Sequence, residues 1–248
     1  MSSHTGQTTA CRPSLLRLAI AASAAVVVGT ALAPATGVAA AVSAPDPTRF
    51  TTTIDNPFLP LVPGTVMRYR ETGDDGTGRV VVRVTHRTKR IQGVRTVVVR
   101  DRAFLGDDLV EDTFDWYAQD RRGNIWYFGE NTKEYENGRV VSTAGSWKAG
   151  RDGARAGIVM KAHPRVGATY YQEFSPGVAE DQATVLSRDL CVRVPYGSFG
   201  HVLKTKDFTA LEPGIVEHKF YARGVGSVLE KLVRGGRERL VLVAVERP

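Results

Sequence analysis

The chain has 248 residues, of which 42% are hydrophobic and 24% are charged, and its formal net charge is +7 at pH 7. An ordinary apolar fraction with 25 glycines and 12 prolines excludes a disordered chain and a collagen-like repeat. Only 2 cysteines are present, which excludes a small domain held together by disulfides. The charge excess is modest and basic residues form no long run, so nucleic acid is not expected as a partner.

Residues 1–40 have the pattern of a secretory signal peptide. Two arginines precede an uninterrupted apolar stretch from Leu18 to Ala33, and small residues follow it. We expect cleavage near Ala39 or Ala40, which gives a secreted or cell-wall-associated protein with no permanent membrane span. The alternative is a retained single-span anchor, because the apolar stretch approaches the length that crosses a bilayer.

Two segments precede the regular part of the mature chain. Residues 41–53 are poor in apolar side chains and predict a flexible spacer, so we place a single domain at 54–248. The domain opens with NPFLPLVPGT, whose three prolines exclude a helix and a central strand. We expect this extended entry to dock Phe58, Leu59 and Leu61 on the core.

Period-two alternation dominates the rest of the chain. In RVVVRVTHR, Val80, Val82 and Val84 share one face, and such runs end at turn signals such as Gln92-Gly93 and Asn137-Gly138. The pattern predicts an all-β fold of about 10–13 short antiparallel strands. One short helix is expected near Ala154 to Met160. Cys191, the one cysteine left after cleavage, is expected to be a half-buried small hydrophobe rather than a catalytic thiol.

The second half of the domain resembles the first, at offsets between 102 and 106 residues. Tyr69-Arg70-Glu71 corresponds to Tyr171-Gln172-Glu173, and Trp116-Tyr117-Ala118 corresponds to Phe220-Tyr221-Ala222. We predict two tandem meanders, at about 63–137 and about 166–246, joined by a connector at 138–165. Together they are expected to form one curved sheet or half-barrel.

The densest group of polar and aromatic residues is the hairpin from Val110 to Glu130, which we expect to be the functional centre. On a strand, Glu111 and Asp115 share one face and Asp112 and Trp116 share the other. Carboxylates beside aromatic rings suit a sugar platform or an acid pair. The candidate binding residues are Glu111, Asp112, Asp115, Trp116, Tyr117, Trp126, Glu130 and Trp147. The alternative is structural, with Glu111 and Asp115 paired to arginines such as Arg100 and Arg102 on neighbouring strands.

Catalytic and metal signatures are weak in this sequence. The mature histidines are scattered, no HExxH or paired-cysteine spacing occurs, and the acidic pairs lack the spacing of calcium loops. Ser198 does not lie in a G-x-S-x-G elbow. We therefore assign no catalytic residue, no metal and no cofactor, and whether the protein is an enzyme stays open, with a non-enzymatic role favoured.

Several long segments resemble a family of exported bacterial proteins, of actinobacterial type, whose function is unknown. The resemblance rests on NPFLPLVPGT, on VEDTFDWYAQDRRGNIWYFGE and on YARGVGSVLE. It implies an exported β-rich domain and carries over no site residue.

Three functions fit these observations. The first is a non-catalytic module that binds an apolar or amphipathic cell-envelope ligand, such as a lipid or glycolipid, on the concave face of the sheet. The second is an extracellular polysaccharide-binding protein or acid-pair hydrolase, and the third is a purely structural secreted domain.

Overall fold

The computed structural model describes residues 45–74 and 76–248, so the predicted signal peptide lies outside the described residues. The described chain forms one antiparallel sheet of 16 strands and a short 3-10 helix, η1 (Pro47–Arg49), which confirms the all-β prediction. The strands are β1 (Phe50–Thr51), β2 (Val66–Gly73), β3 (Gly76–Ile91), β4 (Val94–Leu105), β5 (Asp108–Asp120), β6 (Ile125–Glu136), β7 (Arg139–Ser142), β8 (Trp147–Lys148), β9 (Arg155–Met160), β10 (Thr169–Tyr171), β11 (Glu173–Phe174), β12 (Asp181–Val194), β13 (Gly197–Thr209), β14 (Val216–Ala222), β15 (Gly226–Arg234) and β16 (Arg239–Glu246). Strands outnumber the prediction because five of them are short, β1, β7, β8, β10 and β11.

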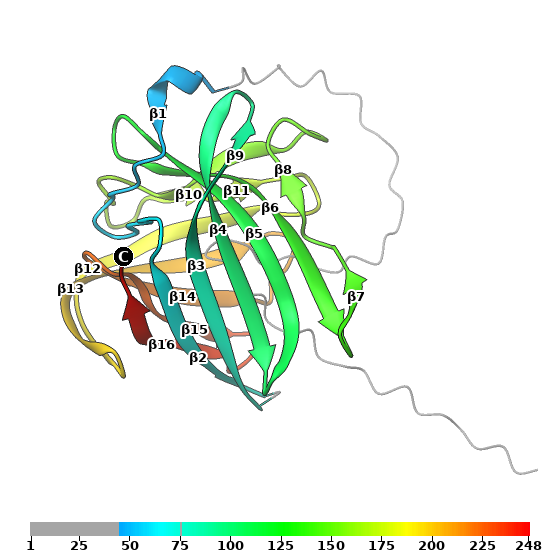
Figure 1. The fold of residues 1–248 in the computed structure, drawn as a ribbon. Coiled ribbons are helices and arrows are strands. Elements are labelled where there is room, and N and C mark those ends of the chain that lie inside the picture. Colours follow the sequence, from blue (N-terminus) through cyan, green and yellow to red (C-terminus); the bar gives the residue numbers. More distant parts are fainter. Residues whose placement is uncertain (1–44, 75) are drawn as a thin grey trace, which may run out of the picture.

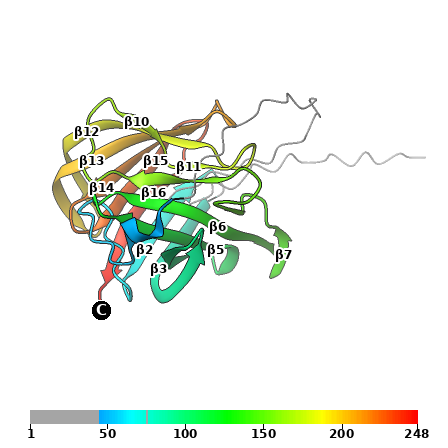
Figure 2. The same ribbon diagram turned by 90° about the horizontal axis from the view of Figure 1, so that it is seen from above.

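The sheet curls until its two ends meet. Its main path runs β10-β12-β13-β14-β15-β16-β2-β3-β4-β5-β6-β9-β11. The end strands β10 and β11 are separated in sequence by Gln172 alone, so the chain itself crosses the seam of a nearly closed barrel. There the Gln172 amide donates a hydrogen bond to the Asp181 carbonyl at 2.8 Å. Figures 1 and 2 show β2–β6 and β12–β15 as facing walls of this barrel.

Local sequence explains the tight hairpins between the long strands. Gln92 and Gly93 have φ values of 46° and 81°, and Asn137 and Gly138 have values of 51° and 72°. Two consecutive positive φ angles are what a type I′ turn requires, and glycine and asparagine adopt them most easily. These two turn predictions are confirmed.

The proline-rich entry segment packs into one end of the barrel. Ile54, Phe58, Leu59 and Leu61 are each at most 2% exposed and belong to the hydrophobic core. Burial of such side chains stabilises the fold by about 1.5–3 kcal/mol each. The entry segment therefore acts as an apolar cap, and the prediction that Phe58, Leu59 and Leu61 pack on the core is confirmed.

Hydrogen bonds fix this cap to turns from both halves of the chain. The Asn56 amide group donates to the Gly123 carbonyl at 2.9 Å, in the β5–β6 turn. The Gly224 amide, in the β14–β15 turn, donates to the Pro57 carbonyl at 2.7 Å. A short segment thus ties together two turns that lie about a hundred residues apart in sequence.

Two local predictions are wrong, the helix near Ala154 to Met160 and a half-buried Cys191, and two segments expected to be irregular contain regular structure. The end of the predicted spacer is ordered, because Asp46 caps η1 and Phe50 in β1 packs edge-on against Trp126 and Phe128. The expected helix near Ala154 to Met160 is strand β9, because its backbone pairs with the free edge of β6. The connector 138–165 also holds β7 and β8, which pair with β6. Cys191 is exposed rather than half-buried.

Matching contacts recur in the two predicted repeats. The Gly64 amide donates to the Val84 carbonyl and the Val84 amide to the Thr65 carbonyl, at 2.8 and 3.0 Å. The same pattern joins Gly167, Val185 and Ala168 at 2.9 and 3.0 Å. Tandem duplication predicts such a recurrence, and the duplication itself stays a prediction.

Candidate functional site

The barrel wall divides the predicted hairpin site between its inner and outer faces. Glu111 and Asp115 point inward from β5, and Asp112 and Trp116 point outward. The sequence pattern predicts this division between two faces but not which face is enclosed. Of the predicted site residues, the structure brings together Glu111, Asp115, Tyr117, Glu130 and Trp147 inside the barrel. It separates them from Asp112, Trp116 and Trp126.

Tyr127 is the centre of the inner group; it lies in the predicted hairpin but is not among the candidate binding residues named above. Its hydroxyl lies 2.7 Å from Asp115 Oδ1 and 3.1 Å from Glu130 Oε2. Its ring stacks on Tyr117 with centroids 4.8 Å apart and meets Trp147 edge-on at 5.4 Å. Alternation along β6 was the signal that could have identified it, because Tyr127 pairs directly with Tyr117 on β5.

One shared proton follows from this geometry. A tyrosine hydroxyl carries a single proton, so it donates to one carboxylate and can only accept at the other. If both contacts are hydrogen bonds, Asp115 or Glu130 must therefore be a neutral carboxylic acid. Burial is the main reason why the pKa of Asp115 is raised to about 7, although its hydrogen bond from Tyr127 acts in the opposite direction.

Further carboxylates extend the inner group around the barrel. Burial, reinforced by the charges of Asp115 and Glu111, raises the pKa of Asp101 well above its ordinary value. Glu173 accepts a hydrogen bond from the Trp147 indole at 2.7 Å, and burial likewise raises its pKa. Carboxylates in such surroundings are favoured in their neutral form.

The opposite wall holds a buried cation, Lys219. Its ammonium lies 3.4 Å from Glu217, 3.7 Å from Glu230 and 3.9 Å from Asp207. Burial raises the pKa of Glu217 to about 8 and that of Asp207 to about 6, and the nearby ammonium opposes both shifts. Asp207, Glu217 and Glu230 of the second half all face inward, around the Lys219 ammonium.

The outer members of the predicted site have structural partners. Arg100 forms a bidentate ion pair with Asp112, at 2.7 and 2.8 Å. The predicted pairing of Arg100 with Glu111 or Asp115 is wrong, because those carboxylates point through the other face of the sheet. Trp116 lies beneath the Lys89 ammonium, 3.4 Å from its ring centroid.

Trp126 lies near the barrel end rather than in the inner group. Its indole donates to Asp120 at 2.9 Å and its ring meets Phe50 edge-on. The β5–β6 turn is held by the same carboxylate, because Asp120 also accepts from the Arg122 and Asn124 amides at 2.9 Å. These hydrogen bonds lower the pKa of Asp120 although partial burial opposes them.

Burial sets a limit on what the inner group can do. Asp115, Tyr117, Tyr127 and Glu173 are 0% exposed. A hydrolase needs its carboxyl pair in a cleft that admits substrate and water. A substrate therefore cannot reach the inner carboxyl pair in this conformation. The same burial argues against a ligand on the concave face beside these residues.

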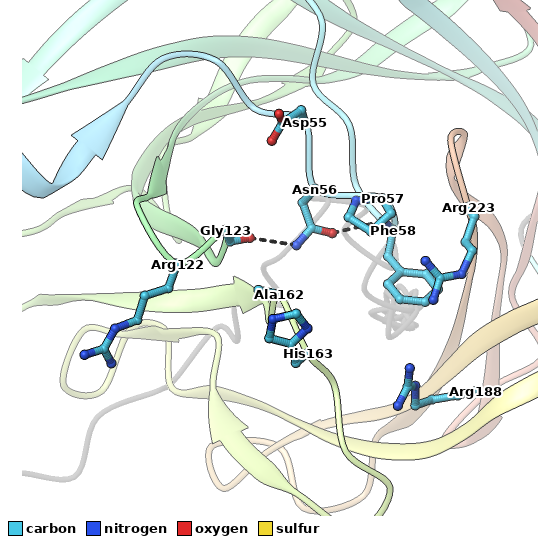
Figure 3. A pocket seen from close by; sticks show the side chains of 10 residues that line it. All are labelled: Asp55, Asn56, Pro57, Phe58, Arg122, Gly123, Ala162, His163, Arg188 and Arg223. Carbon is cyan, nitrogen blue, oxygen red and sulfur yellow. Dashed lines mark hydrogen bonds between the residues drawn. The ribbon is translucent and has the colours of Figure 1, made fainter.

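An open pocket lies instead at the capped end of the barrel (Figure 3). Its volume is about 310 Å³, near the lower end of the range for small-ligand sites. Its walls come from the entry segment, the β5–β6 and β14–β15 turns, the β9–β10 loop and β12. The lining residues are Asp55, Asn56, Pro57, Phe58, Arg122, Gly123, Ala162, His163, Arg188 and Arg223.

Positive charge dominates this end pocket. Arg223 lies over the Phe58 ring, 4.4 Å from its centroid, and Arg188 extends toward it from the opposite wall in Figure 3. Within residues 45–74 and 76–248, no ion pair joins Arg122, Arg188 or Arg223 to a carboxylate. The one acid in the lining, Asp55, accepts a hydrogen bond from Gln119 at 2.6 Å.

Local backbone features place these arginines. Arg188 lies within a register shift of β12 between Ser187 and Leu190, and such a bulge turns a side chain out of the regular alternation. Arg122 and Arg223 lie in the two turns that the entry cap ties together. No local sequence pattern indicates this pocket, because its lining comes from five separate segments.

No group of three or more metal-ligating side chains is arranged to hold a metal ion among residues 45–74 and 76–248. In the same part of the chain, no helix has the length and apolar character needed to cross a membrane.

Among the known proteins compared with this chain, two solved structures are similar to it. No protein-family model matches the chain, and no curated protein matches it. A crystal structure from Bacteroides fragilis NCTC 9343, assigned as an exported protein with a YmcC-like fold, is similar with a TM-score of 0.46 and 14% identity, over 77% of this chain and 99% of that chain. A structure assigned as a lipoprotein of Parabacteroides distasonis ATCC 8503 is similar with a TM-score of 0.42 and 12% identity, over the same shares. The family resemblance described above stays a prediction.

Proposed function

We propose that the protein is an exported, non-catalytic binding module whose end pocket takes an amphipathic ligand with an anionic group. The observation that carries this proposal is the set of three arginines, Arg122, Arg188 and Arg223, around one cleft without a carboxylate ion partner. Guanidinium groups bind carboxylate and phosphate through paired hydrogen bonds. Three nearby positive charges repel one another in the free protein, so binding of an anion that neutralises them lowers the electrostatic free energy.

Apolar lining supports the amphipathic part of the proposal. Pro57, Phe58 and Ala162 lie beside the cationic groups in the pocket. Phe58 is 1% exposed, so it forms the floor of the pocket rather than its rim. A ligand with a charged head and a short apolar part matches both kinds of lining.

The hydrolase alternative has less support. Its carboxyl pair, Asp115 and Glu130, is enclosed by the sheet, and the end pocket holds no second carboxylate beside Asp55. A polysaccharide ligand also fits the pocket less well, because aromatic platforms for sugar rings are limited there to the buried Phe58.

Calorimetric titration of the full chain with dodecyl phosphate tests this function. We expect binding by the wild type and a loss of at least tenfold in affinity for Arg188→Gln/Arg223→Gln, because both lost groups face the head group. Arg193→Gln is the matched control, since Arg193 is exposed on the same strand and does not line the pocket. Equal affinity in all three proteins, or no binding by the wild type, would refute the proposal.

A further inference from the structure

A row of positively charged side chains crosses the outer face of the second-half wall. Direct cross-strand partners run from Lys206 on β13 to His218 on β14, Lys231 on β15 and Arg239 on β16. Directly paired residues of neighbouring strands point to the same face, about 4.5–5.5 Å apart. We call these four residues the basic row. Threonines continue it at both ends, with Thr184 beside Lys206 and Thr72 beside Arg239.

Carboxylates of this wall point the other way. The inward positions next to the basic row hold Asp207, Glu217 and Glu230, which surround Lys219 inside the barrel. No ion pair joins a member of the basic row to a carboxylate within the described residues. On this wall the three carboxylates therefore lie inside the barrel around Lys219, and the basic row lies outside.

Maintaining this row costs stability in the free protein. Like charges directly opposite on a sheet, such as Lys231 and Arg239, destabilise it. Partial burial and then the charges of Lys204, Lys231 and Lys206 lower the pKa of His218. Aromatic rings hold the cations in place, since Lys206 lies 4.4 Å from the Phe208 ring centroid and Lys231 lies 5.7 Å from that of Phe220.

The first half has no such row at the corresponding place. The predicted duplication aligns Lys206 with Arg100, and Arg100 is neutralised by its ion pair with Asp112. The strand partner of Arg100 on β5 is Phe114, where the second half has His218 beside Lys206. The same row is therefore absent from β4–β6, although directly opposed arginines occur elsewhere in the first half, at Arg70 and Arg79 and at Arg90 and Arg95.

Curvature limits what can cover this face. The basic row runs across the strands, around the convex outside of the barrel (Figure 2). A flat bilayer touches a convex surface only over a short stretch. The same holds for duplex DNA, because its persistence length of about 50 nm makes it too stiff to follow the curve. A flexible chain can follow the arc and place a charge beside each cation.

We propose that the basic row binds a flexible linear polyanion, such as a polyphosphate or phosphodiester chain, laid across β13–β16. Binding neutralises Lys206, Lys231 and Arg239 together and releases the counterions that surround the free polyanion. This site is separate from the end pocket and does not depend on its ligand.

Binding of long-chain inorganic polyphosphate to the full chain, measured by calorimetry over a series of salt concentrations, tests the proposal. We expect Lys206→Gln/Lys231→Gln to lose at least tenfold in affinity and to reduce the salt slope by about two. Lys206→Arg/Lys231→Arg should retain binding. Arg83→Gln/Arg95→Gln is the matched control, because it removes two exposed charges from the outer face of β3 and β4.

Three outcomes would overturn the proposal. Equal losses in the two glutamine variants would show attraction to net charge alone. Tighter binding of phosphatidylglycerol vesicles or of duplex DNA, lost in Lys206→Gln/Lys231→Gln, would assign a different class of partner. Undiminished binding by Lys206→Gln/Lys231→Gln would place the anion elsewhere. The pocket variant Arg188→Gln/Arg223→Gln should bind polyphosphate like the wild type, which keeps this test independent of the proposed function.

Discussion

Lys219 and Asp115 occupy matching places on the two walls of the barrel. Asp115 lies between Val99 and Glu130 on the neighbouring strands, and Lys219 lies between Thr205 and Glu230. The predicted duplication aligns Val99 with Thr205, 106 residues apart, and Asp115 with Lys219, 104 residues apart, whereas Glu130 and Glu230 are 100 residues apart and lie outside its offsets. One position thus carries a raised-pKa carboxyl on one wall and an ammonium on the other, so the two buried networks differ in their charge balance.

Replacing Lys219 by methionine should destabilise the protein in a pH-dependent way. Removing one partner of a buried ion pair costs about 3–5 kcal/mol, because the remaining charges are left uncompensated. We expect that loss at pH 7.5 and a smaller one at pH 5, which is below the pKa values of about 6 for Asp207 and about 8 for Glu217, so that these two carboxyls need less compensation by a cation. Urea unfolding at both pH values measures it.

Lys133→Met is the control for this variant, because Lys133 is exposed on β6. Its effect should stay within about 0.5 kcal/mol at either pH. A loss for Lys219→Met that does not change with pH would contradict the assignment of an ionic network.

Replacing Asp115 by asparagine should stabilise the protein at high pH. With a folded-state pKa of about 7 against an ordinary value of 3.8, Asp115 keeps its proton in the folded state after it has lost it in the unfolded state. Its contribution to the free energy of unfolding is therefore fully present below about pH 3.8 and is lost as the pH rises to about 7. At about 1.4 kcal/mol per pKa unit, the loss approaches about 4 kcal/mol.

Asparagine cannot ionise, so the difference in unfolding free energy between Asp115→Asn and the wild type should grow from near zero at pH 4 to its full value at pH 8. Asp107→Asn is the control, because Asp107 is exposed and lies outside the barrel. A variant that is less stable than the wild type at every pH would show that the ionised carboxylate is required.

Replacing Gly129 by alanine should disrupt the β6–β8 contact. Gly129 has a φ of 124°, and an added Cβ would lie against the Trp147 carbonyl oxygen and 2.8 Å from Lys148 Cα. We expect a loss above about 3 kcal/mol, because the clash is with backbone and the dihedral itself costs about 1–3 kcal/mol. Thermal unfolding measures the effect.

Gly177→Ala is the control that separates the steric clash from the strain of a positive φ angle. Gly177 has a φ of 68°, and an added Cβ would meet no atom within 4 Å. Its loss should be about 1 kcal/mol. Equal losses at both glycines would show that the close approach of Trp147 is not what requires Gly129.

Alternation and turn residues determined much of this fold from the sequence alone. Period-two patterns identified the long strands, and Gln92-Gly93 and Asn137-Gly138 identified hairpin turns, because both are local properties of the backbone. Alternation also showed that Glu111 and Asp115 share a face that Asp112 does not. It could not show which face the barrel encloses, so the pairing of Arg100 was assigned to the wrong carboxylates.

Only the tertiary structure decided where the candidate sites lie. Closure of the sheet buried Asp115 with Tyr127 and placed Lys219 among acids from three strands, and this burial is what raises the carboxyl pKa values. The end pocket depends on the entry segment reaching two distant turns, which brings Arg188 and Arg223 to one cleft. Such contacts join residues far apart in sequence, so no local pattern encodes them.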